Sequence, residues 1–600
     1  MIRVLFIPCL AALVSLGCAA PSAQSALSSA VTAASPLTPE EEQKRNRLKN
    51  VLDRLPRIEE ESFNDYQQRA RAALKADSAL PAQSLAEELI GTGNEAAKAS
   101  SRQLRPVLLA NWAKSRLEKR RNEYLSALIQ HPTTFVPGQK VPGRNAAFDG
   151  FDAELRAQSD ALGLSIHDLE KVAYEVMLPG SQRDQRETQV GVLVHADVVP
   201  ADEPGWNTPP FAGIVAEDRI IGRGAMDDKG PLVATLFALA ALRDSQVPLR
   251  ANPVLIIGTS EETHWHGIER LVEEKGLPAS VFVADGGFPA GIGEKGVTTV
   301  RVRTQAPPVA PSRAMSAERL RLVSFEGGQV SNQVPATAKA HLQPLSTEQL
   351  PTWQARLELM ASQYPDVALQ VESSSDGLWV HATGKAAHGA SPAKGVNAVS
   401  HLARFLIERL QYADSPCAQL LWLLDRQLGV NVDGSALGVG DTHPEFTPAT
   451  VNLGTFRQFE NGSCEAALNI RWPPPRKPEQ IVAAVRESLK REAKLLPGNG
   501  SLELEVSGGG LPPYLADRKS PMVRSLLSAY AHVTGENAEP LTLSGTTYAK
   551  AVPGGGITFG PGMANQKGSR IHVPNEYLTF EEFDRLVELY TLALANLCIE

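Results

Sequence analysis

Three short apolar runs, residues 192–194, 254–257 and 281–284, are each followed by side chains that can bind a metal ion. Continuous runs of this length and composition indicate strands of a parallel sheet that is buried on both faces. In open α/β sheets, ligand-binding groups gather at the carboxyl ends of such strands. The residues that follow the three runs are His195, Glu261, Glu262 and Asp285. One imidazole and several carboxylates at one sheet edge favour a divalent metal site.

A further candidate, Asp227, lies in the glycine-punctuated stretch of residues 222–230. Such a stretch by itself is usually only a turn. Here it lies between the first two apolar runs, so it can deliver Asp227 to the same sheet edge. Residues 231–242 follow it directly and are apolar on several sides, which predicts a buried helix packed on the sheet.

Composition limits the classes of partner. The chain has 600 residues, of which 43% are hydrophobic and 21% charged, so it can form two or more globular domains. Lys and Arg number 59 against 67 Asp and Glu, a mild acidity that leaves no basic face for nucleic acid. We therefore expect no nucleic-acid partner.

The amino terminus is typical of an export signal. Arg3 precedes an apolar stretch, residues 4–16, that is too short to span a membrane as a stable helix. Residues 15–18, Ser-Leu-Gly-Cys, resemble a bacterial lipoprotein cleavage site with lipidation at Cys18. The alternative is ordinary cleavage near Ala20 and soluble export. Either route predicts export to the periplasmic side of a bacterial membrane. In the first, which we favour, the lipid at Cys18 would be the only membrane contact.

The rest of the chain alternates helix-like and strand-like patterns, which predict an α/β domain interrupted by an inserted α+β domain. A charged, helix-rich extension precedes it, and we interpret that extension as a packing or spacer segment. The predicted segments are a signal peptide (1–18), a linker (19–38), a helical extension (39–117), the first part of a catalytic domain (118–299), an inserted domain (300–508) and the second part of the catalytic domain (509–600). Cys417, Cys464 and Cys598 are odd in number and scattered, so we expect neither a disulfide framework nor a thiolate metal site.

Several short motifs follow one another in a fixed order. They are His195-Ala-Asp197, residues 222–230, Glu261-Glu262-Thr263, Asp285 with Phe288-Pro289, Glu294-Lys-Gly296, Asn332-Gln-Val-Pro335, residues 384–392, Asn469-Ile-Arg471 and His572. Each motif alone is weak, but their ordered conjunction, over residues 118–600, resembles the M20 metallopeptidase family and most closely its dipeptidase (PepV-like) branch. The resemblance implies a two-metal exopeptidase domain with an inserted lid domain.

The resemblance also implies a ligand set for two divalent metal ions. His195, Asp227 and Asp285 would hold one ion. Asp227, Glu262 and His572 would hold the other, so that Asp227 bridges the pair. Imidazole nitrogens and carboxylate oxygens suit Zn²⁺ best, with Mn²⁺ or Co²⁺ as alternatives.

Two further carboxylates match residues that serve the chemistry. Glu261 would act as general base, taking a proton from the metal-bridging water that attacks the peptide bond and returning it to the leaving amine. Asp197 would fix the imidazole of His195; the alternative is a simple strand-end cap. His264 and His266 lie near Glu261, but we interpret them as surface histidines or as neighbours of the ligands.

Three residues of the insert match substrate contacts of the family. His388 would stabilise the oxyanion, Arg471 would receive the terminal carboxylate of the substrate, and Asn332 would reach the same substrate. For an isolated His or Arg in a strand, packing would be the favoured interpretation. Because the insert is about twice as long as the lids through which other members dimerise, we expect a monomer that favours dipeptides.

Two alternatives to a dipeptidase remain. One is an amidohydrolase that removes acyl groups from amino acids, because the same two-metal site serves that chemistry. The other is a non-catalytic, tethered peptide or metal binder, which should have lost a ligand or the base. The sequence departs from the family at Gly286-Gly287 and at Thr546, and both loops are expected to shape the substrate pocket, so the side-chain preference stays open.

Overall fold

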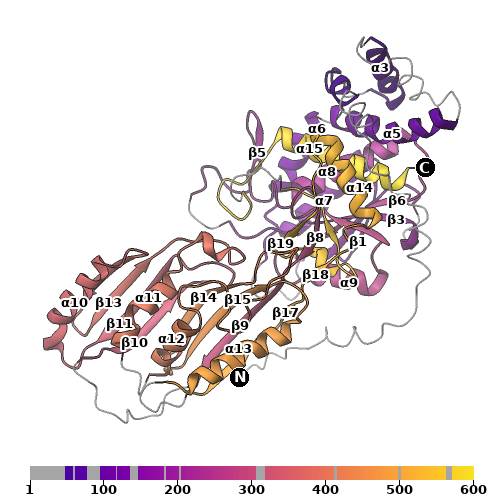
Figure 1. The fold of residues 1–600 in the computed structure, drawn as a ribbon. Helices are drawn as coiled ribbons and strands as arrows, with labels where there is room; N and C mark the ends of the chain where they lie inside the picture. Colours follow the sequence, from indigo (N-terminus) through magenta and orange to yellow (C-terminus); the bar gives the residue numbers. More distant parts are fainter. Residues whose placement is uncertain are drawn as a thin grey trace. The chain divides into compact units, whose positions relative to one another are not determined.

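Two compact units make up the part of the chain that the computed structural model describes (Figure 1). That part comprises residues 48–58, 61–76, 95–116, 118–135, 146–181, 184–201, 205–305, 318–410, 415–496, 502–562 and 570–599. The predicted signal peptide, the linker and Cys18 lie outside it. The first unit spans residues up to Ala290, Asp517–Glu539 and Thr558–Glu600; the second spans Gly291–Ala516 and Pro540–Ile557. The predicted insert, residues 300–508, falls within the second unit.

The three predicted strands are neighbours in the sheet of the first unit. The order of its strands includes β1 (Ser165–Leu169), β2 (Ala173–Met177), β6 (Asn252–Gly258), β3 (Gln189–His195) and β7 (Ser280–Val283). β3 is parallel to both β6 and β7, whereas β1 and β2 are antiparallel. β3 is buried along its whole length, as is β6 after its first residue, which explains their continuous apolar composition.

Helices cover this sheet. α8 (Lys229–Ser245) is buried from Lys229 to Leu242, which confirms the helix predicted after the Asp227 stretch. α15 (Phe580–Cys598) packs against α8, and α14 (Pro521–Thr534) packs against α15. The remaining helices of the unit are α3 (Phe63–Ala76), α5 (Glu95–Ser115), α6 (Glu118–Ile129), α7 (Ala146–Ala161) and α9 (His266–Lys275). The predicted α/β class and the helical amino-terminal region are therefore confirmed.

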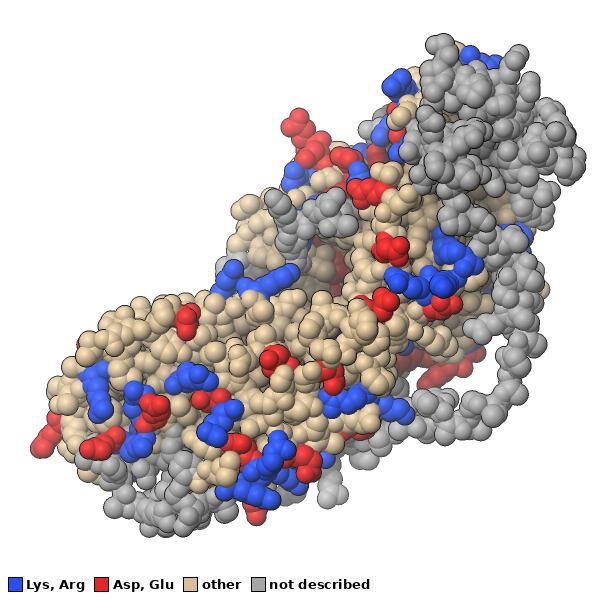
Figure 2. Space-filling view, in the orientation of Figure 1, with Lys and Arg blue, Asp and Glu red and all other residues tan. Residues whose placement is uncertain are grey.

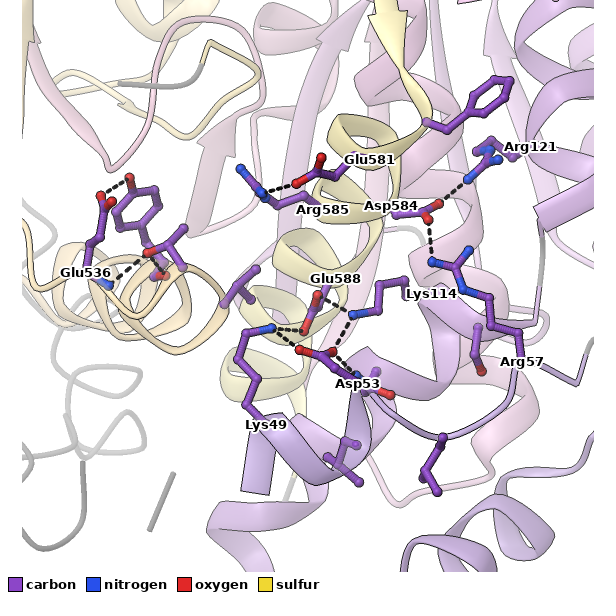
Figure 3. Close-up of a pocket in the computed structure, with 18 residues that line it drawn as sticks. Lys49, Asp53, Arg57, Lys114, Arg121, Glu536, Glu581, Asp584, Arg585 and Glu588 are labelled. Atoms are coloured by element: carbon purple, nitrogen blue, oxygen red, sulfur yellow. Dashed lines mark hydrogen bonds and ion pairs between the residues drawn. The ribbon is translucent and has the colours of Figure 1, made fainter. Parts of the chain in front are cut away.

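Ion pairs join the helical extension to α15 around a pocket of ≈ 770 Å³ (Figure 3). The ammonium of Lys114 lies 2.9 Å from a carboxylate oxygen of Asp53 and 2.9 Å from one of Glu588 on α15. Asp584, one helical turn earlier on α15, pairs with Arg57 at 2.8 Å. α5 also packs directly on α15. The described residues of the extension thus include a part that packs on α15.

A small sheet links two distant parts of the first unit. β21 (Tyr577–Thr579) pairs antiparallel with β5 (Arg219–Ile221), and β5 pairs with β4 (Ile214–Val215). β5 leads directly into the Asp227 stretch, and β21 follows His572 by a few residues. The pairing therefore brings these two segments together although about 350 residues separate them.

The second unit is built on an antiparallel sheet. Its strand order is β12 (Ala368–Ser373), β13 (Leu378–Thr383), β11 (Thr337–Gln343), β10 (Arg321–Gly327), β14 (Thr450–Gln458), β15 (Cys464–Trp472), β9 (Gly296–Thr304) and β16 (Leu504–Ser507), with β17 (Gly510–Leu511) also on β9. Four helices pack against the sheet: α10 (Leu350–Ser362), α11 (Ala398–Leu406), α12 (Pro416–Gln427) and α13 (Pro478–Ala493). This is the α+β arrangement expected for the insert.

Three further short strands of the second unit are not part of this sheet. β8 (Gly291–Glu294) pairs antiparallel with β18 (Tyr514–Leu515) and parallel with β19 (Leu541–Leu543).

On the surface of the second unit, acidic and basic side chains are interspersed on the face in view (Figure 2). No helix among the described residues is long and apolar enough to cross a membrane.

One prediction about the cysteines was wrong. Cys417, in the first turn of α12, and Cys464, the first residue of β15, form a disulfide with their Cα atoms 5.6 Å apart. Cys598 is a buried free thiol. The sequence could not predict the Cys417–Cys464 pair, because the two residues are 47 positions apart. Only the packing of the helix on the sheet brings them close together.

Candidate metal centre

The register of the parallel strands explains why the candidate ligands meet. His195, the last residue of β3, lies opposite Gly258 of β6, and Leu193 lies opposite Val283 of β7. Glu261 and Asp285 follow these partners by three and two residues. All three side chains therefore start from one edge of the sheet, as the apolar runs predict.

Asp227 lies between the two candidate histidines. Its Oδ1 is 2.9 Å from Nε2 of His195, and its Oδ2 is 3.1 Å from Nε2 of His572. Nε2 of His572 is also 2.8 Å from Oε1 of Glu262, and Nε2 of His195 is 3.9 Å from Oδ2 of Asp285. The two oxygens of Asp227 thus face two different clusters, which is the arrangement that a bridging carboxylate needs.

The side chains form overlapping groups whose ligand atoms lie within 4.8 Å of one another. These groups are His195 with Asp227 and Asp285, Asp227 with Glu262 and His572, and His195 with Glu261 and Glu262. The first two groups correspond to the ligand sets that the resemblance implies. In the third, Glu261 takes a ligand position instead of the role of base, so the two roles must be separated by experiment.

The electrostatics of the site favour a cation. Burial raises the pKa of Glu261 well above its ordinary value, and the carboxylates of Asp285 and Glu262 raise it further. Burial opposes the charge on His572, yet Glu262 and Asp227 raise the pKa of that imidazole to about 11. Carboxylates therefore outnumber the neighbouring positive charges. The donor set, imidazole nitrogens and carboxylate oxygens without thiolate, fits two divalent ions.

Asp197 holds two parts of the site together. Its backbone oxygen lies 2.8 Å from Nδ1 of His195, so the ring can donate there and direct Nε2 to the centre. Its carboxylate accepts the backbone N–H groups of Glu261 and Glu262, each at 2.9 Å. Asp197 therefore orients a candidate ligand and fixes the turn that carries the candidate base. The carboxylate itself lies 3.6 Å from the imidazole, farther than a hydrogen bond.

Glu576 is a residue of the site that sequence reasoning missed. Its Oε1 accepts the backbone N–H groups of Gly224, Met226 and Asp227 at 3.0–3.1 Å. Its Oε2 accepts a hydrogen bond of 2.8 Å from the buried guanidinium of Arg223. Because Glu576 follows His572 by only four positions, it ties the Asp227 stretch to the segment that carries a second candidate ligand. That proximity in the sequence was the one available signal.

We expect Glu576→Gln to weaken metal binding. The amide keeps one acceptor oxygen but leaves the buried charge of Arg223 unpaired, which costs about 3–5 kcal/mol of folding stability. The loosened Asp227 stretch should lower metal affinity about 10- to 100-fold, as loss of a group that orients a ligand typically does. Titration against a coloured chelator measures the affinity. Glu581→Gln, at an exposed carboxylate on α15, is the matched control. Unchanged affinity in Glu576→Gln would contradict this role.

The predicted substrate residues all belong to the second unit. Asn332 and His388 are adjacent, because the backbone N–H of Gly389 donates to the carbonyl of Asn332 at 2.6 Å. Arg471, on β15, donates to Oγ1 of Thr546 at 3.1 Å and to Oδ1 of Asn469 at 3.2 Å. In the first unit, His264 and His266 are exposed, and neither joins a metal-capable group of the described residues.

Comparisons with known proteins point to one family. The model of peptidase family M20/M25/M40 matches residues 191–596. A protein of Staphylococcus haemolyticus (strain JCSC1435) named "Putative dipeptidase" is 32% identical over 461 residues, which cover 76% of this chain and 92% of that protein. Another protein named "Putative dipeptidase", from Staphylococcus epidermidis (strain ATCC 12228 / FDA PCI 1200), is 31% identical over 441 residues, which cover 73% of this chain and 88% of that protein. The solved structure of a dipeptidase from Saccharomyces cerevisiae superposes with a TM-score of 0.47 at 13% identity, covering 82% of this chain and 98% of that one.

Proposed function

Because the chain belongs to peptidase family M20/M25/M40 and is a metallopeptidase, we propose that it hydrolyses the peptide bond of dipeptides at the centre around Asp227. The observation that carries this proposal is the position of Asp227, whose two oxygens face His195 and His572 at 2.9 and 3.1 Å. Relatives that match over most of their length are named as dipeptidases, which supports the substrate class.

We assign His195, Asp227 and Asp285 to one metal ion and Asp227, Glu262 and His572 to the other. Two divalent ions bound there would polarise the scissile carbonyl and lower the pKa of a shared water. The native metal is proposed as Zn²⁺. Mn²⁺ and Co²⁺ are alternatives, because the donor set contains no thiolate that would narrow the choice.

We assign the proton transfers of the reaction to Glu261. A carboxylate held beside the ligands can take a proton from the attacking water and pass it to the amine that leaves. Asp197 accepts the backbone N–H of Glu261, which fixes the turn from which the side chain of the base projects. We assign His388 to the developing oxyanion, Arg471 to the terminal carboxylate of the substrate, and Asn332 to the same substrate.

A substrate panel tests this function. We expect the metal-loaded protein to hydrolyse dipeptides, and to hydrolyse longer peptides and N-acetyl amino acids at least about tenfold more slowly in kcat/KM. A clamped terminal carboxylate limits cleavage to the last peptide bond, so slower cleavage of longer chains would mean that the site excludes residues on the amino-terminal side of that bond. Preference for N-acetyl amino acids would instead support the amidohydrolase. Binding of peptides without any hydrolysis would support the non-catalytic binder.

We also propose that the chain is exported and anchored through a lipid at Cys18. The export-like amino terminus supports this, and so does the Cys417–Cys464 disulfide, since such bonds persist in oxidising compartments. Cell fractionation of the full chain and of Cys18→Ser tests it. Loss of membrane association in the variant is expected, and equal association of both would contradict the anchor.

A further inference from the structure

A second cluster of buried charges lies in the second unit, around Arg471. Glu294, Lys295 and Arg471 are 0%, 1% and 6% exposed, and the side chain of Lys550 is 4% exposed. Buried charges are ordinarily paired, because removing an ion from water without a partner is costly. This cluster contains three cations and one carboxylate.

The single carboxylate is already engaged. Glu294 lies 3.8 Å from the ammonium of Lys550 and accepts two hydrogen bonds from Thr547, one from its hydroxyl at 2.7 Å and one from its backbone N–H at 3.2 Å. Lys550 also donates to the carbonyls of Lys295 and Pro512, each at 2.8 Å. Glu294 and Lys550 thus neutralise each other and hold the 544–550 loop in place.

Arg471 and Lys295 form no close ion pair among the described residues, although the charge of Glu294 acts on Arg471 from a longer distance. Among the described residues, no carboxylate lies within 4.0 Å of either cation. Arg471 donates only to neutral acceptors, on Asn469, Thr546 and Ser544. The Lys295 ammonium donates to the carbonyl of Pro448 at 2.6 Å. Burial and the charge of Arg471 lower the pKa of Lys295 to about 8, which still leaves it largely protonated at neutral pH.

Arg471, on β15, and Lys295, which immediately precedes β9, lie at the same end of two neighbouring strands. Arg471 lies between Thr450 of β14 and Val297 of β9. Lys295 is two residues before Val297, and its acceptor Pro448 is two residues before Thr450. Both cations are therefore at the same end of the same strands, and each carries donors that protein groups do not neutralise.

The loop of residues 543–546 contacts both cations. Ser544 and Thr546 both accept from Arg471, and the backbone N–H of Lys295 donates to the carbonyl of Leu543 at 3.1 Å. A Cβ atom added to Gly545, between the two contacts of Arg471, would meet no atom within 4 Å. Open space therefore lies at Gly545, in the loop that supplies two acceptors to Arg471.

We propose that Arg471 and Lys295 together bind two carboxylates, so that the protein prefers dipeptides whose carboxy-terminal residue is aspartate or glutamate. This inference rests on the proposed function in taking Arg471 as the site of the terminal carboxylate. The second carboxylate, on the substrate's own side chain, then offsets the charge of Lys295. Charge-assisted hydrogen bonds to carboxylates provide the affinity.

Kinetics on isosteric substrate pairs test the preference. Wild type should cleave Ala-Glu about 10- to 100-fold faster than Ala-Gln in kcat/KM, the range expected for one charge-assisted hydrogen bond. Lys295→Met should bring this ratio towards one, and Lys295→Arg should retain most of it. Lys339→Met, which removes an exposed lysine of the same unit, is the control and should keep the wild-type ratio. A wild-type ratio near one, or an unchanged ratio in Lys295→Met, would overturn the proposal.

A binding measurement separates this inference from the proposed function and does not depend on a folded variant. Calorimetry on the wild-type protein should show L-glutamate binding at least about tenfold more tightly than L-glutamine, and equal affinities would overturn the site. If no dipeptide is cleaved but L-glutamate is selected, the proposed function fails and the anion site stands. If dipeptides are cleaved without acidic preference, this inference alone fails.

Discussion

Glu261→Gln is expected to lower kcat by roughly 10²–10⁴-fold while the metal content stays near two ions per chain, because the change removes only acid–base catalysis. The amide is almost isosteric with the carboxylate but cannot accept a proton at neutral pH. The backbone N–H of residue 261 still donates to Asp197, so the turn that carries Glu262 should keep its position.

The metal content decides between the two roles that the geometry permits for Glu261. His195, Glu261 and Glu262 form one of the groups whose ligand atoms lie within 4.8 Å of one another. If Glu261 were a ligand, elemental analysis of Glu261→Gln would show fewer ions per chain, together with lost activity. Unchanged kcat would instead refute its role as base. Glu273→Gln, at an exposed carboxylate on the nearby helix α9, controls for the loss of one negative charge.

The sequence was most informative where candidate metal-binding side chains directly follow a strand. His195, Glu261 and Asp285 could be placed at one edge because buried parallel strands carry a continuous apolar pattern and their carboxyl ends align. The structure has that register, with His195 opposite Gly258 and Leu193 opposite Val283. The buried helix α8 was predictable for a similar reason, since it is apolar around most of its circumference.

Residues that position other groups could not be predicted from the sequence, because their partners are distant in the chain. Glu576 is recognisable only once β21 pairs with β5 and brings its carboxylate to the N–H groups of Gly224, Met226 and Asp227. The Cys417–Cys464 pair likewise depends on the packing of α12 against the second sheet. The charge balance at Lys295 requires knowing that Glu294 is already paired with Lys550.

Strand patterns and the order of the motifs identify different residues of the site. Strand ends and the Asp227 stretch are enough to suggest a cation site, but they assign no ligand to a particular ion. Among the described residues, no strand directly precedes His572: it lies in an irregular segment and has a φ of +61°, so strand periodicity did not identify it. The ordered motifs supplied that residue, and the structure brings its imidazole to 2.8 Å from Glu262.

Asp227→Asn is expected to abolish activity together with metal binding. Each carboxylate oxygen of Asp227 faces a different histidine, and the amide of Asn offers one oxygen and one NH₂ group, which is not a ligand. Loss of one shared ligand should therefore lower the occupancy of both ions. The ions provide several kcal/mol of transition-state stabilisation, so their loss corresponds to about 10³-fold or more in kcat.

Chelation of the wild-type protein should reproduce this loss, and Zn²⁺, Mn²⁺ or Co²⁺ should restore activity to the wild type but not to Asp227→Asn. Elemental analysis and dipeptide hydrolysis on the same samples give the two measurements. Asp218→Asn, at an exposed carboxylate beside Arg219, is the matched control and should retain both metal and rate. Full activity in metal-free wild type, or two firmly bound ions in Asp227→Asn, would contradict the bridging role of Asp227, because either result would mean that this carboxylate does not hold the catalytic ions.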